Sequence, residues 1–94
     1  MHIYMAYLDM PTILRILGIL WIIHTRDHGF PHVTVYKGSP KNYEAVAKIR
    51  LDIVEVIESK GFSEKFLNKI LEQTHNYQAL LLEAWNEIHE EEEN

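Results

Sequence analysis

Residues 17–36, LGILWIIHTRDHGFPHVTVY, decide the fold class. Within residues 17–24, the side chains that point to either face of a strand are apolar: Ile19, Trp21 and Ile23 on one face, and Leu20 and Ile22 on the other. The stretch is rich in β-branched and aromatic side chains, which predicts a strand covered on both faces. Residues 27–31 contain a glycine that accepts positive φ and a proline that is incompatible with a helix interior, so the chain is expected to reverse there. Residues 32–36 alternate between polar and apolar side chains, which indicates a second strand.

Two more strands are expected further along the chain. Residues 38–40 contain the glycine and proline of a second turn, and residues 43–50 alternate again between small or apolar and charged side chains. A short fourth strand is expected over residues 53–57, after a tight turn near Asp52. Four consecutive strands with short connections predict an antiparallel meander.

After Gly61 the apolar period becomes that of a helix. Ser63 is expected to cap the first helical turn, because its hydroxyl can accept a hydrogen bond from a free backbone amide. Apolar residues recur at helical spacing over 66–74 and over 77–88. The pattern leaves open whether Asn76 caps a second helix or one bent helix continues. The expected fold is α+β, a four-stranded antiparallel meander with two C-terminal helices packed on one face.

Composition bounds the class of protein. The 94 residues suffice for one domain, and a hydrophobic content of 47 % is enough for a folded core. The absence of cysteine excludes disulfides, thiolate metal sites and cysteine nucleophiles, and the net charge of −5 argues against a protein that coats nucleic acid. The expected division is a flexible extension over 1–9, a single α+β domain over 10–90 and an acidic tail over 91–94.

The apolar run over residues 13–23 does not indicate a membrane protein. It is shorter than the ~20 apolar residues of a spanning helix and contains Arg15. The first nine residues hold no Lys or Arg, and no small-residue cleavage site follows the run, so a secretory signal is not expected either. The sequence predicts a cytoplasmic protein.

His24, His28 and His32 are spaced by four residues, but Gly29 and Pro31 exclude a helix there. On a hairpin, His24 and His32 can approach each other across the turn. Three interpretations stay open: imidazoles that fix the turn by hydrogen bonds, a general acid or base or phosphate contact, and metal ligands. Because few carboxylates lie near in sequence, we expect no metal site, and we expect no cofactor.

A second group of candidate residues lies on the predicted sheet. His32 and Tyr36 share one face of their strand, and Lys48 and Arg50 share one face of the next. If the strands pair in register, these side chains form a basic and aromatic patch that contacts phosphate or a protein partner; the alternative is an ordinary solvated sheet face. The expected binding residues are Arg26, His28, His32, Tyr36, Lys48 and Arg50.

Three motifs resemble a bacterial family, domain of unknown function 4160. They are the start MPTI at 10–13, the turn that leads into PHV at 31–33, and LLEAW at 81–85. Phe30 stands where that family usually has a proline, and Thr34 where it usually has a third turn histidine. The resemblance implies that Met10 is the family-like start. It also implies a toxin–antitoxin-like gene pair, because the genes of the family often neighbour those of another small family.

The sequence therefore predicts a small binding module, one partner of a toxin–antitoxin-like pair. It is expected to engage a protein partner, which includes a second copy of the chain, or nucleic acid, through the sheet face around His32. The alternative is a metal-independent ribonuclease that uses His28 or His32 with Lys48 or Arg50. The sequence leaves the enzyme question open and favours binding over catalysis.

Overall fold

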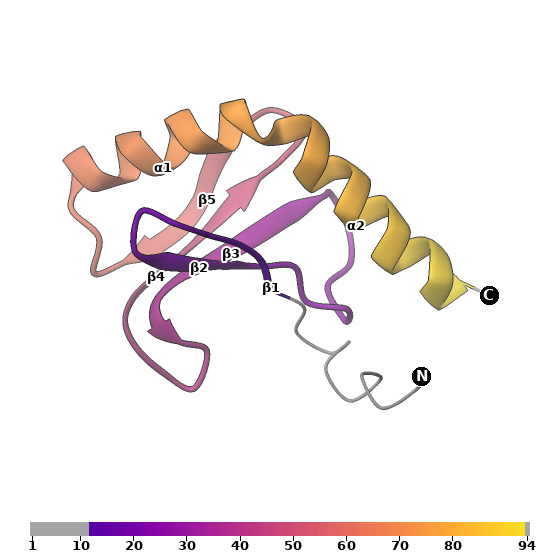
Figure 1. The fold of residues 1–94 in the computed structure, drawn as a ribbon, viewed down its shortest axis with the longest axis horizontal. Helices are drawn as coiled ribbons and strands as arrows, with labels where there is room; N and C mark the ends of the chain where they lie inside the picture. The colour runs from indigo at the N-terminus through magenta and orange to yellow at the C-terminus, as the bar shows by residue number, and fades with distance from the viewer. Residues whose placement is uncertain (1–11, 94) are drawn as a thin grey trace.

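A computed structural model describes residues 12–93 of the chain, with side chains described up to residue 89. Five strands form one antiparallel sheet in the order β1-β2-β3-β4-β5, and two helices follow (Figure 1). The elements are β1 Thr12–Ile16, β2 Ile19–Ile22, β3 His32–Ser39, β4 Asn42–Arg50, β5 Glu55–Lys60, α1 Glu64–Asn76 and α2 Gln78–Glu93. The α+β class, the antiparallel sheet and the two C-terminal helices are confirmed. The predicted extension over 1–9 lies outside the described residues, and the backbone of the predicted tail continues α2 to Glu93.

The prediction of four strands is wrong, because the sheet has five. Leu17 and Gly18, which the apolar pattern predicts to lie in a strand, form the two-residue turn between β1 and β2, with φ values of 59° and 70°. Positive φ at both central residues is typical of the turn type that matches the twist of a hairpin. The apolar run over 13–23 is thus two strands that pair with each other, and Gly18 is the residue that divides it.

One face of the sheet packs against both helices. Trp21, Val35 and Ala47 lie side by side on β2, β3 and β4, and all three are buried. They form one apolar cluster with Ile70 of α1 and with residues of α2, including Trp85. Burial of a side chain of the size of Val35 or Ile70 contributes roughly 1.5–3 kcal/mol, which is why the meander needs the helices as a cover.

Ser63 marks the start of α1, and Tyr77 marks the break between α1 and α2. The hydroxyl of Ser63 accepts a hydrogen bond from the backbone amide of Phe66 at 3.1 Å, which confirms the predicted cap. Asn76 is the last residue of α1, and Tyr77 separates the two helices, so the chain adopts two helices rather than one. Within residues 12–93, no helix has the length and apolar character needed to cross a membrane.

Candidate functional site

The second face of the sheet gathers most of the residues that the sequence singled out. His32 lies opposite Arg50, Thr34 opposite Lys48, and Tyr36 opposite Val46. Residues directly opposed on antiparallel strands point to the same side of the sheet. We call this side, which carries Thr34, Tyr36 and Lys48, the open face, because the apolar cluster that includes both helices lies on the other side.

His32 stands at the end of the open face and is buried, with 5 % of its surface exposed. Its Nδ1 lies 3.0 Å from the carbonyl oxygen of Phe30, and because a carbonyl only accepts, Nδ1 carries the proton. Its Nε2 lies 3.0 Å from Oδ2 of Asp27, within ion-pair distance but without hydrogen-bond geometry. The ring also packs 5.1 Å from the indole of Trp85. The imidazole of His32 therefore stabilises the turn that precedes β3, and it is too deeply buried to contact a large ligand.

His89 of α2 holds the same turn from the other side. Its Nε2 lies 2.7 Å from the backbone oxygen of Asp27, and its Nδ1 lies 2.9 Å from that of Trp85. A neutral imidazole donates one of these hydrogen bonds, and the charged form donates both. The ring stacks on Trp85 at 3.8 Å, so the indole lies against two imidazoles, those of His32 and His89. The turn over 24–31 is thereby joined to α2.

A histidine–tyrosine pair lies on the open face. Nε2 of His24 is 2.9 Å from the hydroxyl of Tyr36, and the two rings meet edge to face. Burial lowers the pKa of His24, with His32 and Lys48 acting in the same direction and Asp27 opposing them. Burial also raises the pKa of Tyr36 above its ordinary value. At neutral pH the tyrosine hydroxyl therefore donates to the neutral imidazole.

The lowered pKa of His24 predicts acid sensitivity of the fold. Since the pKa in the folded state lies below the unfolded value of about 6.5, the unfolded chain binds more protons as the pH falls below that value. This contribution to stability is fully present above the unfolded pKa and is lost as the pH falls toward the folded one. Urea unfolding at pH 7.5 and 5.5 should show a smaller acid-induced loss in His24→Gln than in the control His75→Gln, whose histidine is exposed. Equal losses in the two variants would contradict the assignment.

A groove on the open face has a buried hydroxyl among its lining residues. The groove has a volume of about 340 Å³ and is lined mainly by β4 and β5, including Tyr43, Lys48 and Lys60. Thr34 is 4 % exposed, and its Oγ1 has no hydrogen-bond partner in the described part of the chain. Nearly all buried polar groups in proteins are hydrogen-bonded. The wall of the groove therefore contains an unsatisfied hydroxyl, which a partner group reaches only when neighbouring groove side chains move. Lys48, Lys60 and Glu58 line the same groove.

The structure brings only some of the predicted binding residues together. Tyr36 and Lys48 share the open face, and Lys48 also lies 3.8 Å from the carboxylate of Glu58. Arg50 donates two hydrogen bonds to Asp52, at 2.8 and 2.9 Å, and this contact lowers the pKa of the Asp52 carboxyl. The guanidinium of Arg50 is therefore already engaged.

The other two predicted contacts, Arg26 and His28, are exposed in the turn and are not among the residues that line the groove. Among the described side chains, no three of His, Asp or Glu lie close enough to hold a metal ion.

Sequence reasoning did not include four residues of this region among its binding contacts: His24, Thr34, Tyr43 and Lys60. Thr34 and His24 had a usable signal, because alternation places Thr34 on the same side of its strand as His32 and Tyr36, and His24 on the same side as Ile22. The structure then pairs Ile22 with Thr34. Lys60 had none, because the predicted fourth strand ended at residue 57, before this side chain.

Comparison with known proteins gives one match. A family model described as a domain of unknown function, DUF4160, matches residues 18–86, which is more than half of the chain. The match extends from the β1–β2 turn to α2 and so includes the groove. No curated protein and no solved structure gives a significant match.

Proposed function

The chain belongs to the DUF4160 family, and we propose that it is a small protein-binding module whose open-face groove receives an acidic side chain of a partner protein. The observation that carries this proposal is the buried hydroxyl of Thr34, which lines the groove without a partner. A carboxylate from outside accepts the hydrogen bond that this hydroxyl has to give, and Lys60 supplies complementary charge. Lys48 adds to it by exchanging its long, exposed pair with Glu58 for the incoming carboxylate.

A protein partner fits the open face better than nucleic acid does. The cations there are largely matched by acidic neighbours, as in the pairs Lys48–Glu58 and Arg50–Asp52, whereas affinity for nucleic acid depends on unmatched positive charge. The exposed aromatic residues Tyr43 and Phe30, the latter under the guanidinium of Arg50 at 4.3 Å, are of the types enriched at protein interfaces. In a toxin–antitoxin-like arrangement, the partner is the product of a neighbouring gene.

Site-specific photo-crosslinking in the source cells tests the proposal. A photoreactive amino acid is placed at Tyr43, which lines the groove, is exposed, and has its ring 5.5 Å from that of Tyr36. In a second variant it is placed at Glu72, which is exposed on α1. We expect one protein to cross-link from position 43 and not from position 72. That protein is then identified, purified and titrated with the native chain. Cross-linking from both positions alike, or from neither, contradicts the proposal.

Reversing one charge of the groove should weaken the complex. We expect Lys48→Glu to raise the Kd for the identified partner at least about tenfold, because the partner's carboxylate then meets a like charge. Lys65→Glu, an exposed change on α1, is the matched control and should leave the Kd unchanged. Thermal unfolding of Lys48→Met, which removes the charge without repelling Glu58, shows whether the fold tolerates the position.

Labelled RNA separates the competing functions. His32 is buried and Arg50 is bound to Asp52, so two of the four groups of the ribonuclease alternative are already engaged. We therefore expect no cleavage of RNA and no saturable binding at physiological salt. Cleavage that disappears in His28→Ala, or salt-dependent RNA binding that Lys48→Glu abolishes, would overturn the protein-binding proposal in favour of that function.

A further inference from the structure

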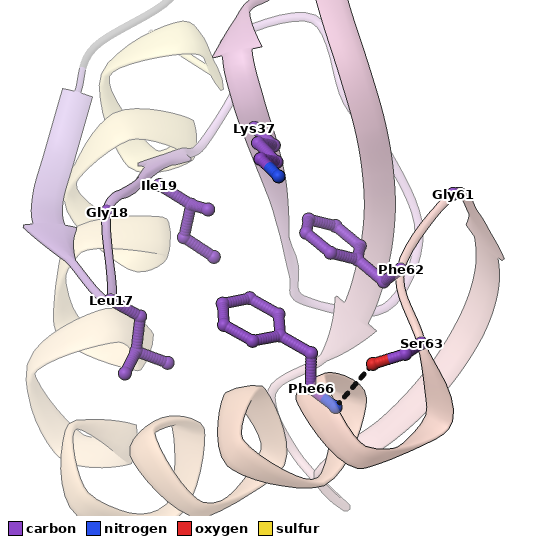
Figure 2. A pocket seen from close by; sticks show the side chains of 8 residues that line it. All are labelled: Leu17, Gly18, Ile19, Lys37, Gly61, Phe62, Ser63 and Phe66. Carbon is purple, nitrogen blue, oxygen red and sulfur yellow. Dashed lines mark hydrogen bonds between the residues drawn. The ribbon is translucent and has the colours of Figure 1, made fainter.

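A second cavity lies at the other side of the sheet, where the β1–β2 turn approaches the start of α1 (Figure 2). Its volume is about 510 Å³, which is within the range of small-molecule sites. It is lined by residues from β2, β3 and the segment that leads into α1, so elements distant in sequence meet there. None of these residues lines the open-face groove.

The walls of this cavity are mainly apolar. Phe62 and Phe66 stack with ring centroids 5.4 Å apart and planes 17° from parallel. Leu17 and Ile19 lie on the opposite wall in Figure 2, so the space between the walls has an aromatic and an aliphatic side. Gly61 fixes the start of the aromatic wall, because its φ of +92° and its close approach to β4 leave no room for a side chain. An apolar body of ligand size buries its surface between these walls.

One cation stands at the cavity. Lys37 lines it, and in Figure 2 its side chain extends toward the space between Ile19 and Phe62. Its Nζ lies 3.5 Å from a carboxylate oxygen of Glu44, in a pair whose side chains are 60 % and 79 % exposed. Exposed pairs of this kind contribute little, so a ligand carboxylate can take the place of Glu44 at small cost.

We propose that this cavity binds an amphipathic carboxylate, with an alkyl or aryl body between the two walls and its carboxylate on Lys37. The cavity selects this class because it combines apolar walls with one cation. A neutral apolar molecule packs between the walls but leaves the charge of Lys37 unpaired. A small polar anion pairs with Lys37 but leaves the apolar walls exposed to water. The site is separate from the protein-binding groove and does not depend on it.

Titration of the full chain followed by amide NMR tests this inference. The probes are octanoate and 3-phenylpropionate, each compared with its alcohol. We expect saturable shifts of the amides of Gly18, Gly61 and Phe62, with a Kd of about 1 mM or below for the acid. The acid should bind at least about fivefold more tightly than the alcohol. Tighter binding of octanoate identifies an alkyl body, tighter binding of 3-phenylpropionate an aryl one, and both support the proposal.

Two lysine variants provide the decisive comparison. Lys37→Met should remove the preference for acid over alcohol, and Lys41→Met, another exposed lysine of the same sheet end, should leave it intact. Lys37 is exposed, so its replacement leaves the fold in place. Equal binding of acid and alcohol by the native chain, shifts that do not saturate, or shifts centred on Thr34 and Lys48 would overturn the inference.

Discussion

Replacement of Trp85 by alanine is expected to lower the free energy of unfolding by about 3–5 kcal/mol. The indole is 7 % exposed and belongs to the apolar cluster between the sheet and the helices. It also contacts the imidazoles of His32 and His89, at 5.1 and 3.8 Å, and thus joins the turn over 24–31 to α2. Because small domains are stable by only about 5–15 kcal/mol, a loss of this size is a large share of the total.

Urea unfolding and hydrogen exchange measure the two consequences separately. Trp85→Phe, which keeps an aromatic ring, should lose less stability than Trp85→Ala, and Glu87→Ala, an exposed change on the same helix, should be nearly neutral. In Trp85→Ala, the amides of the turn should gain more in exchange rate, relative to the native chain, than the amides at the middle of β4. The amide of Leu51, which donates to the Pro31 carbonyl at 2.9 Å, should behave like those of the turn. A loss below about 1 kcal/mol would contradict the role assigned to the indole.

Gly61→Ala should lower the free energy of unfolding by about 2–6 kcal/mol, and Gly29→Ala by clearly less. The two glycines have nearly the same φ, +92° and +91°, so alanine is strained by about 1–3 kcal/mol at either position. They differ in surroundings. A Cβ at position 61 would lie 2.6 Å from the backbone oxygen of Glu44 and 2.9 Å from the Cβ of Ala45, whereas a Cβ at position 29 meets nothing within 4 Å. The clash with backbone atoms adds about 1–3 kcal/mol at position 61 alone.

The midpoint of urea unfolding distinguishes these two contributions. The difference between the variants reports the close approach of Gly61 to β4, because the conformational strain is common to both. Equal losses of unfolding free energy in the two variants would show that the positive φ alone destabilises them, and that the backbone at Glu44 moves to make room for the Cβ. Since Gly61 also precedes Phe62, Gly61→Ala should in addition disturb the cavity that we assign to an amphipathic carboxylate.

Local signals in the sequence were sufficient for most of the fold. Alternation along 32–36 and 43–50 placed β3 and β4 and the side chains they share, and Ser63 marked the start of α1. The missing strand, β1, was hidden because Leu17 adopts positive φ, which is rare for a leucine and therefore was not read as a turn residue. Gly18 alone could have indicated the hairpin.

The candidate site was less accessible to sequence reasoning. Alternation correctly placed Tyr36 and Lys48 on one face of the sheet. His32 is buried against Trp85, and His89 binds the backbone of the same turn at Asp27, 62 residues away in sequence. No local pattern reports such contacts. The same is true of Thr34, because an unsatisfied hydroxyl can be recognised only when all of its neighbours are known.

The most direct test of the groove is a charge swap across the complex, measured by calorimetry with the cross-linked partner. One variant is Lys48→Glu, and the other replaces the partner's groove-bound acidic residue by lysine. The account predicts that each change alone raises the Kd at least about tenfold and that the two together recover most of the lost binding. A native Kd for Lys48→Glu, or no recovery in the double exchange, would show that the open-face groove does not receive the partner's carboxylate.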